Sequence, residues 1–319
     1  MKSSFINELR AGDEVVNEPF LLAEVSRRNT RDGRLYFLCS FADKTGQIGG
    51  IFWDVPNYIN EWARPGLVVL VTGRVNEYKD ALQLTATDMN PLPEPDMADF
   101  LPASQRPREE MKAELLSIID SLASPWQEFV RHLLLQESFL NSYVNSPAAR
   151  QMHHAFIGGL LEHTLSMAKT AVFLAQHYAY VNKDLLLAGV LLHDMGKVYE
   201  YNLNGQFDYS EDGRLVGHIV RAIVEIEKAA AATNLLTEDQ LRQLIHLVAS
   251  HHGTQEWGSP VVPRTLEAIL LHQIDLLDSR VQGFLDHLES DQIENGWTVK
   301  HSPMFKTVLR QPDGMEIGD

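Results

Sequence analysis

The spacing of apolar residues changes once along the 319-residue chain, at the proline-dense segment PLPEPDMADFLPASQRP, residues 91–107. Before this segment, short runs rich in β-branched and aromatic residues alternate with turn signals such as Asp32-Gly33, which is typical of strands. After it, apolar residues recur every three or four positions, which is typical of helices. A chain of this length also exceeds what one hydrophobic core usually organises. The sequence therefore predicts a β domain followed by a helical domain.

The first part of the chain contains five strand-like runs, at residues 20–28, 34–43, 48–54, 67–78 and 81–89. A short helix is predicted between Pro56 and Ala63, after the third run. Five strands with a helix after the third describe a small Greek-key β-barrel, and their order and length resemble the OB-fold.

The predicted boundaries follow from these patterns. We expect a barrel domain at residues 1–92, a proline-rich linker of extended character at 93–110, an all-α helical bundle at 111–298 and a C-terminal tail with little signal at 299–319. One stretch inside the helical part, residues 198–213, alternates aromatic residues around Asn204-Gly205. This stretch predicts a hairpin lying against the helices.

Charge and cysteine content restrict the class of protein. The net charge of -16 argues against nonspecific duplex binding through a large basic surface, although a local basic groove is compatible with it. The N-terminal residues lack a stretch of signal-peptide length, and no apolar segment is long enough to span a bilayer. The single cysteine, Cys39, lies in a run that resembles a buried strand, so we expect a reducing, cytoplasmic location.

Histidines and two acids in the helical part are the candidates for chemistry. A lone histidine on an apolar helix is more often a core residue than a ligand, so each one is weak evidence by itself. Asp194 follows the apolar run LLLAGVLL, and Asp275 lies inside LEAILLHQIDLLDSR. Burying these carboxylates is costly unless a cation compensates them. Imidazole and carboxylate without cysteine suit manganese, iron, cobalt or nickel better than structural zinc.

The order of these residues resembles a known superfamily. HTL at 163–165, HDMGK at 193–197, GHI at 217–219, SHHG at 250–253 and ID at 274–275 resemble the HD superfamily of metal-dependent phosphohydrolases. Together with the phrase HHAFIGGLLEHTLSM at 153–167 and the upstream barrel, the chain is similar to the YhaM family of bacterial 3'-to-5' exoribonucleases. The similarity extends from about residue 14 to residue 290.

The resemblance implies a set of metal ligands. It assigns one ion to His163, His193, Asp194 and Asp275, and a second to His218 and His251, with Asp194 bridging. Two such ions, manganese first and cobalt, iron or nickel as alternatives, activate hydroxide for in-line displacement. Some HD phosphodiesterases hold a third metal through a glutamate one helical turn before the first histidine. Gly159 occupies that position here, which predicts two metals.

The candidate catalytic residues are Asp194, Lys197, His252 and His154. Lys197 would neutralise a nonbridging phosphate oxygen, or else be a solvated cation at a helix end. His252 would bind phosphate, protonate the leaving 3' oxygen or support the ligands. His153-His154 precedes Gly158-Gly159, where a substrate backbone could approach closely, or where a helix begins with exposed imidazoles.

An OB barrel binds single strands by stacking bases on aromatic rings and following phosphates with basic side chains. The candidates for nucleic-acid binding are Arg27, Arg28, Arg34, Lys44, Tyr36, Trp53 and Tyr78. Because side chains alternate along a strand, half of the aromatic residues should face the core. The alternative for the basic cluster is an ordinary solvated turn.

These patterns predict a metal-dependent exoribonuclease that releases nucleoside monophosphates from the 3' end of single-stranded RNA, with single-stranded DNA as a further substrate to test. One alternative is an HD phosphohydrolase of a small nucleotide or cyclic dinucleotide, with the barrel serving regulation or self-association. Another is a noncatalytic single-strand-binding protein. The polarity and the RNA preference come from the family resemblance, and the patterns leave the native metal and a homo-oligomeric state open.

Overall fold

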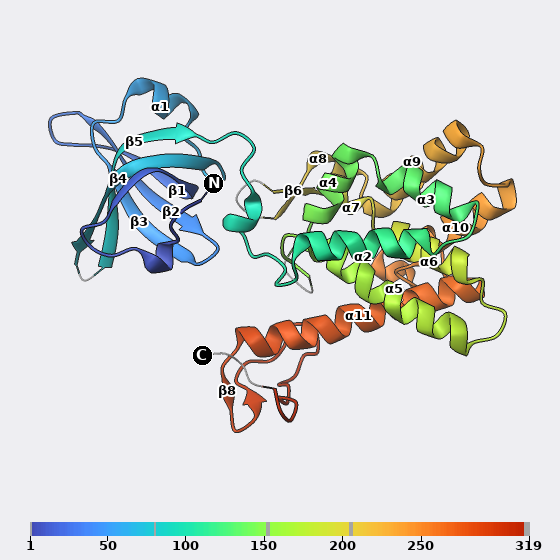
Figure 1. Ribbon diagram of the computed structural model, residues 1–319. Coiled ribbons are helices and arrows are strands. Elements are labelled where there is room, and N and C mark those ends of the chain that lie inside the picture. The colour runs from blue at the N-terminus through green and yellow to red at the C-terminus, as the bar shows by residue number, and fades with distance from the viewer. Residues whose placement is uncertain (1, 80, 151–153, 204–206, 316–319) are drawn as a thin grey trace. The chain divides into compact units, whose positions relative to one another are not determined.

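The computed structural model describes residues 2–79, 81–150, 154–203 and 207–315. The chain forms two compact units, Met1–Ala103 with Asn202–Asp208, and Ser104–Tyr201 with Tyr209–Asp319. The first unit contains a closed β-barrel and the second is predominantly helical (Figure 1). The predicted fold class, a small barrel followed by an all-α bundle, is confirmed.

Five strands close the barrel in the order β1-β2-β3-β5-β4. They are β1 (Glu14–Asn29), β2 (Leu35–Asp43), β3 (Gly46–Phe52), β4 (Val68–Tyr78) and β5 (Ala81–Pro91), and the 3-10 helix η1 (Ile6–Glu8) precedes them. β3 and β5 pair in parallel, whereas the other neighbouring strands are antiparallel. Helix α1 (Asn57–Trp62) follows β3 as predicted, which is the element order of an OB-fold.

Alternation along β2 separates the barrel core from its surface. Phe37, Cys39 and Phe41 are buried, whereas Leu38 is exposed. Burial raises the pKa of the Cys39 thiol to about 12. Gly50 of β3 admits the Phe41 ring, because a Cβ atom at Gly50 would lie 2.3 Å from it. The barrel core therefore needs a residue without a side chain at position 50, so that the Phe41 ring can occupy this space.

The proline-dense segment is less extended than its composition predicts. It contains the 3-10 helix η2 (Met97–Asp99), and the Asp99 carbonyl accepts a hydrogen bond from the Lys44 amide at 3.0 Å. Phe100 and Leu101, which follow, are buried in the first unit. These two apolar side chains provide the burial that holds this part of the segment in place.

The second unit contains helices where apolar periodicity predicts them, and also two short helices, at residues 197–200 and 211–215, in the stretch for which only a hairpin is predicted. They are α2 (Arg108–Asp120), α3 (Trp126–Leu134), α4 (Glu137–Asn145), α5 (Gly159–His177), α6 (Lys183–Leu192), α7 (Lys197–Glu200), α8 (Glu211–Leu215), α9 (His218–Thr233), α10 (Glu238–Ser250) and α11 (Leu266–Ser290), with the 3-10 helix η3 (Gln255–Trp257) before α11. Side-chain caps begin four of them: Asn182 for α6, Ser210 for α8, Thr237 for α10 and Thr265 for α11. No helix in the described part of the chain combines the length and apolarity needed to cross a bilayer.

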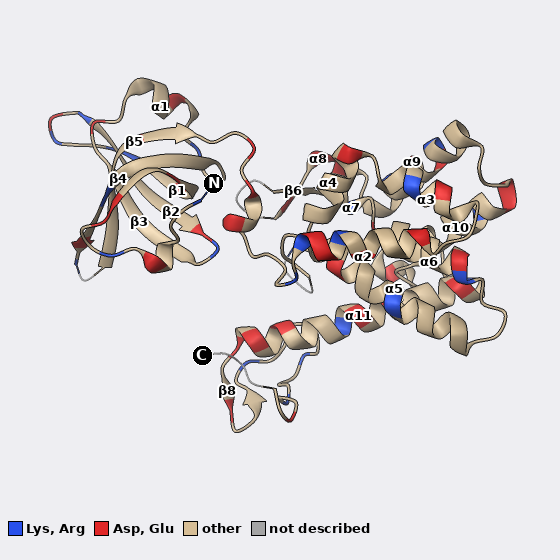
Figure 2. Ribbon diagram, viewed as in Figure 1, with Lys and Arg blue, Asp and Glu red and all other residues tan. Residues whose placement is uncertain are grey.

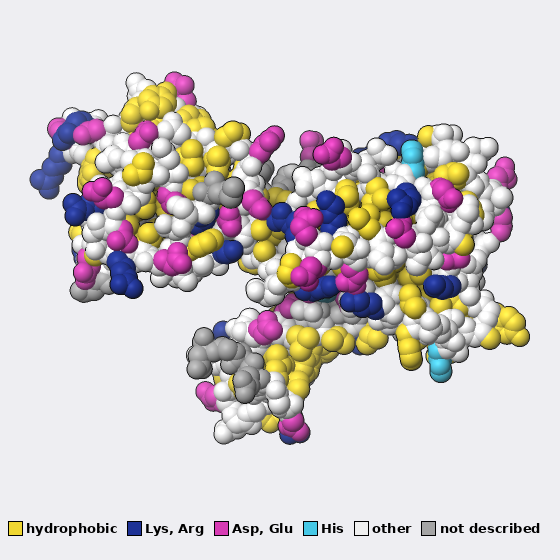
Figure 3. Space-filling model, viewed as in Figure 1, with side chains coloured by type: hydrophobic (Ala, Val, Ile, Leu, Met, Phe, Trp, Pro, Cys, Tyr) yellow, Lys and Arg dark blue, Asp and Glu magenta, His cyan; other side chains and the backbone are white. Residues whose placement is uncertain are grey.

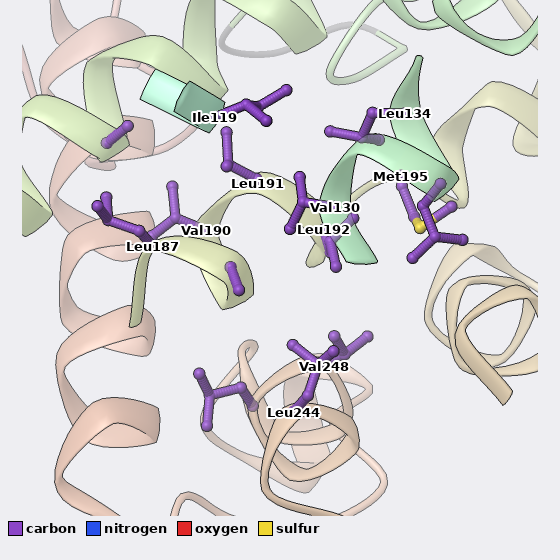
Figure 4. Close-up of a cluster of buried hydrophobic side chains, with 14 of the residues drawn as sticks. Ile119, Val130, Leu134, Leu187, Val190, Leu191, Leu192, Met195, Leu244 and Val248 are labelled. Atoms are coloured by element: carbon purple, nitrogen blue, oxygen red, sulfur yellow. The ribbon is translucent and has the colours of Figure 1, made fainter. Parts of the chain in front are cut away.

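Helix α6 lies inside the core of the helical unit. All eight residues from Leu185 to Leu192 are buried, as expected for an uninterrupted apolar run. Leu187, Val190, Leu191 and Leu192 belong to the same cluster as side chains of α3 and α10 (Figure 4). This packing fixes the end of α6, and therefore the residues that follow it.

Two short hairpins lie in the second half of the chain. β6 (Tyr201–Asn202) and β7 (Asp208–Tyr209) form a hairpin at the predicted place, although Asn204-Gly205 lies outside the described residues. Residues 202–208 group with the first unit, so packing of this hairpin against the helices stays a prediction. β8 (Ile293–Glu294) and β9 (Trp297–Thr298) follow α11. The tail, for which the sequence pattern predicts little, is folded: Thr298 N donates to the Leu309 carbonyl at 2.9 Å, and Leu309 is buried.

Candidate metal centre and nucleic-acid face

Six predicted ligands converge in the helical unit. They are His163 in α5, His193 and Asp194 directly after α6, His218 at the start of α9, His251 directly after α10 and Asp275 within α11. Helices α6 and α10 share one core, so the residues that follow them come together. The ring centroids of His193 and His251 are 5.0 Å apart.

Asp194 joins these histidines, with its two carboxylate oxygens facing different partners. Its Oδ2 atom is 3.3 Å from Nε2 of His193 and 3.9 Å from Nε2 of His163. Its Oδ1 atom is 3.6 Å from Nε2 of His218 and 3.6 Å from Nε2 of His251. One buried carboxylate therefore connects two groups of imidazoles.

Hydrogen bonds at Nδ1 set the orientation of three imidazoles. They join His193 to the Val190 carbonyl at 2.8 Å, His251 to the Val248 carbonyl at 2.7 Å and His218 to Glu200 Oε1 at 3.0 Å. The three Nε2 atoms and Oδ1 of Asp194 are buried without a hydrogen-bond partner among the described residues. Such atoms are costly to bury, and a histidine held at Nδ1 with Nε2 left over is the usual metal-ligating arrangement. The donor set therefore fits a divalent transition metal.

The electrostatics of the cluster favour an ionised Asp194 and neutral imidazoles at His251 and His252. Burial opposes the ionisation of Asp194, but the nearby charge of Lys197 helps to hold the pKa of Asp194 well below its usual range. Burial lowers the pKa of His251. Burial and the neighbouring His251 lower the pKa of His252 to about 4. Ionised carboxylates and neutral imidazoles are the forms that ligate metals.

His163 lies between two carboxylates of α11. Its Nε2 atom is 3.4 Å from Asp275 Oδ1, and its Nδ1 atom donates to Asp278 Oδ2 at 2.7 Å. Burial disfavours a charged imidazole, but the two acids overcome this and raise the pKa of His163 to about 9. Asp278 also accepts hydrogen bonds from Nε2 of His154 at 3.0 Å and from the Ser166 hydroxyl. The two acids therefore stabilise positive charge at His163, whether a proton or a metal ion carries it.

Asp278 and Glu200 support ligands but are absent from the predicted site. Asp278 follows Asp275 by one helical turn, so helical spacing offered a signal for it. Glu200 precedes His218 by 18 residues and lies in a different helix. No pattern in the sequence links that pair.

A cleft of about 630 Å³ opens onto the cluster within the helical unit. Its lining includes the predicted residues Asp194, Lys197, His252 and Asp275. Lys197 is almost fully buried, and its Nζ atom is 2.5 Å from Asp194 Oδ2. A ligand that enters the cleft therefore reaches both the central carboxylate and a cation.

The two catalytic candidates among the histidines lie in different places. His252 lines the cleft, and its Nδ1 atom donates to the Trp257 carbonyl at 2.8 Å. His154 is 2% exposed and is not among the described residues that line the cleft. Its side chain contacts Asp278, so a direct contact between His154 and substrate stays a prediction that these contacts do not support.

The glycines before His163 serve the chain's own packing. A Cβ atom at Gly159 would lie 2.0 Å from the carbonyl oxygen of His154. Gly159 therefore admits the chain's own backbone, which favours the second of the two alternatives for Gly158-Gly159, a helix start. His154 is also not an exposed imidazole, and His153 lies outside the described residues.

The outer surface of β2 and β3 carries aromatic residues of the barrel. Tyr36 and Trp53 lie side by side with their ring centroids 4.8 Å apart, and Trp53 is 48% exposed. Arg28 of β1 is the register partner of Tyr36. Tyr78, at the end of β4, is exposed, whereas Phe37 faces the core. The surface formed by Arg28, Tyr36 and Trp53 is of the kind on which bases stack.

The predicted basic residues are engaged to different degrees. Basic side chains gather where β1 and β2 are joined (Figure 2), and they project from that end of the barrel (Figure 3). Arg27 donates to the Ala63 carbonyl at 2.7 Å, at the end of α1, so it has a structural role. Arg34 and Lys44 lie near acidic side chains. Arg28 has no ion pair within the described ranges, which leaves it the best placed to meet a phosphate.

Comparison with known proteins finds two matching domain families and several similar proteins. Residues 160–280 match the model of the HD domain, and residues 21–92 match that of an OB-fold nucleic acid binding domain. The 3'-5' exoribonuclease YhaM of Geobacillus sp. (strain WCH70) is 34% identical over 313 residues, which are 94% of this chain and 96% of that protein. The proteins of the same name from Bacillus licheniformis and Bacillus subtilis are 34% and 32% identical, over 84% of this chain and 86% of each relative.

Proposed function

This chain belongs to the YhaM family of 3'-5' exoribonucleases, and we propose that it hydrolyses single-stranded RNA at a two-metal centre in its helical unit. It is a metal-dependent 3'-5' exoribonuclease. The observation that carries the metal centre is a set of buried atoms that have no hydrogen-bond partner among the residues the structure describes, Nε2 of His193, His218 and His251 with Oδ1 of Asp194. Such atoms are tolerated in a core when a cation satisfies them.

We assign one ion to His163, His193, Asp194 and Asp275, and the other to His218 and His251, with Asp194 bridging. The two oxygens of Asp194 support this division, because Oδ2 faces His193 and Oδ1 faces His218 and His251. We favour manganese, with cobalt, iron and nickel as alternatives, since imidazole and carboxylate ligands without thiolates suit these ions. When bound, such a pair supplies an activated water and charge stabilisation for in-line displacement.

Two side chains of the cleft are assigned to the phosphate and the leaving group. Nζ of Lys197 lies 2.5 Å from Oδ2 of Asp194, so it would also lie close to a phosphate bound at the metal centre. There its positive charge would partly neutralise the negative charge of the phosphate. His252 donates from Nδ1 to the Trp257 carbonyl, so Nε2 of the neutral ring carries no proton; to protonate the leaving 3' oxygen it would first take a proton from the attacking water and then pass it on. His154 acts through Asp278 as a positioning residue for His163.

The barrel is assigned to strand binding. In this proposal the barrel domain, residues 1–92, binds single-stranded RNA and the helical domain, residues 111–298, hydrolyses it. Residues 93–110 link the two domains, and residues 299–319 form the C-terminal tail. The strip formed by Arg28, Tyr36 and Trp53 supports this role, because it combines stacking surfaces with a cation. We assign the protein to the cytoplasm, since Cys39 is a buried free thiol.

The test is digestion of a 5'-labelled single-stranded RNA with manganese, with a chelator and with Asp194→Ala. The expected result is a ladder that shortens from the 3' end, requires metal and disappears in Asp194→Ala, while strand binding persists. Asp239→Ala, which changes an exposed aspartate of α10, is the matched control and should behave as wild type. Undiminished cleavage by metal-loaded Asp194→Ala would refute the bridging role. A single-stranded DNA of the same sequence tests the sugar preference.

A further inference from the structure

The cleft extends beyond the proposed metal ligands along one face of α11. Ser279 and Arg280 line it one turn beyond Asp275 and Leu276, which also line it. Its volume of about 630 Å³ is in the range of small-ligand sites, about 300–1,000 Å³. Part of the cleft is therefore lined by residues outside the proposed metal ligands, and the cleft as a whole is large enough to hold a small ligand beside the metal centre.

The C-terminal segment provides one wall of this part of the cleft. Pro303 and Met304 line it, although they lie in the tail that follows α11. Met304 packs on Gly283 of α11, where a Cβ atom would lie 2.7 Å from the methionine methyl group. The Phe305 ring also lies edge-on to Phe284, with centroids 5.9 Å apart. The wall is thus fixed to the helix that carries Asp275.

Trp257 adds an aromatic surface to the same cleft. Its indole is 52% exposed, although its backbone is anchored by the hydrogen bond between its carbonyl and His252. Leaving half of an indole ring in contact with water is unfavourable, and a ligand that covers the ring removes this cost. Base–aromatic stacking is the interaction that such a ring offers beside a phosphodiesterase centre.

Arg280 adds a cation that the chain does not neutralise. Two cations line the cleft, and Lys197 forms an ion pair with Asp194. Arg280 is exposed and forms no ion pair in the part of the chain that the structure describes. In a chain of net charge -16, an arginine without an ion pair beside the reactive centre favours an anionic ligand.

We infer that this part of the cleft is the binding site for the 3'-terminal nucleotide of the RNA. Trp257 stacks on the terminal base, Pro303 and Met304 form the apolar wall beside it, and the exposed Arg280 binds the next phosphate upstream of the scissile one, which belongs to the penultimate nucleotide. The inference rests on the proposed function, because the scissile phosphate must lie at the metal centre for the released nucleotide to occupy this space.

The test combines removal of the indole with removal of the base. Two 5'-labelled RNAs are compared, one ending in a normal 3' nucleotide and one ending in an abasic residue. For the wild type, kcat/KM should be roughly 5- to 150-fold higher for the base-bearing RNA, the range that stacking covers. In Trp257→Ala this ratio should fall toward 1, and Trp257→Phe should retain part of it.

Matched controls separate the site from general damage. Trp297→Ala changes an indole of similar exposure, 47%, that is not among the described residues lining the cleft, and it should keep the wild-type ratio. Arg280→Ala should raise KM for both RNAs about tenfold or more, and Arg280→Lys should recover part of this. All variants should bind manganese as wild type does.

Two outcomes would overturn the inference in distinguishable ways. A Trp257→Ala protein that binds manganese normally and keeps the full preference for the base-bearing RNA would remove the stacking site and leave the proposed function intact. A wild-type protein that shortens neither RNA from the 3' end would overturn the proposed function, and the nucleotide site with it.

Discussion

Replacement of Asp278 by asparagine tests whether the metal centre depends on the residues behind it. Asp278 accepts hydrogen bonds from His163 at 2.7 Å and from His154 at 3.0 Å, and a third from Ser166. It does not belong to the six assigned ligands. Asparagine keeps the size of the side chain, but it removes the charge and replaces one acceptor oxygen with a donor.

The size of the effect follows from these contacts. Asparagine loses at least one hydrogen bond to a histidine, and a bond of this kind to a charged group contributes about 1.5–3 kcal/mol. A change of about 1.4 kcal/mol is tenfold in an equilibrium constant. Manganese affinity should therefore fall about 10- to 100-fold, which is also the usual cost of removing a partner that supports a metal-bound histidine.

Manganese binding should be measured directly, by competition with a fluorescent chelator, and activity should be followed as manganese is raised. We expect weaker binding in Asp278→Asn and recovery of most of the RNA cleavage at high manganese. Glu289→Gln, which changes an exposed acid near the end of the same helix, should alter neither. Unchanged manganese affinity in Asp278→Asn would refute the reasoning, because it would mean that His163 keeps its orientation without this partner.

Four further predictions concern the barrel and the metal. Arg27→Ala should lower the free energy of unfolding by about 1 kcal/mol, because it removes hydrogen bonds to the end of α1. Arg28→Ala should leave stability unchanged and reduce the slope of log K for RNA binding against log salt concentration by about 0.7. Urea unfolding and RNA titrations check both variants. A slope equal to that of the wild type would mean that Arg28 does not contact the RNA. Gly50→Ala should cost about 1–3 kcal/mol in urea unfolding, because its Cβ would overlap the Phe41 ring; wild-type stability would show that the ring moves freely. Manganese at 100 times its Kd should stabilise the fold by about 2.7 kcal/mol, seen as a rise in Tm that a chelator abolishes and that a metal-independent fold would lack.

The sequence by itself determined the order of the elements. Alternation placed the strands of the barrel, and a three-to-four-residue period placed the helices, because each pattern records which side of an element meets a core. It also identified six residues that the fold brings together, His163, His193, Asp194, His218, His251 and Asp275. Buried acids and histidines in apolar helices carry their own signal, since burial without a partner is costly.

Contacts between distant segments were decided only by the tertiary structure. Asp278 meets His163 and His154 across 115 and 124 residues, so no local period links them. Packing within the helical unit also places His154 against Asp278 and Met304 in the cleft wall, and packing within the barrel engages Arg27 at α1. Periodicity acts along one element, whereas which side chains meet depends on how several helices pack around a shared core, and that arrangement exists only once the chain has folded.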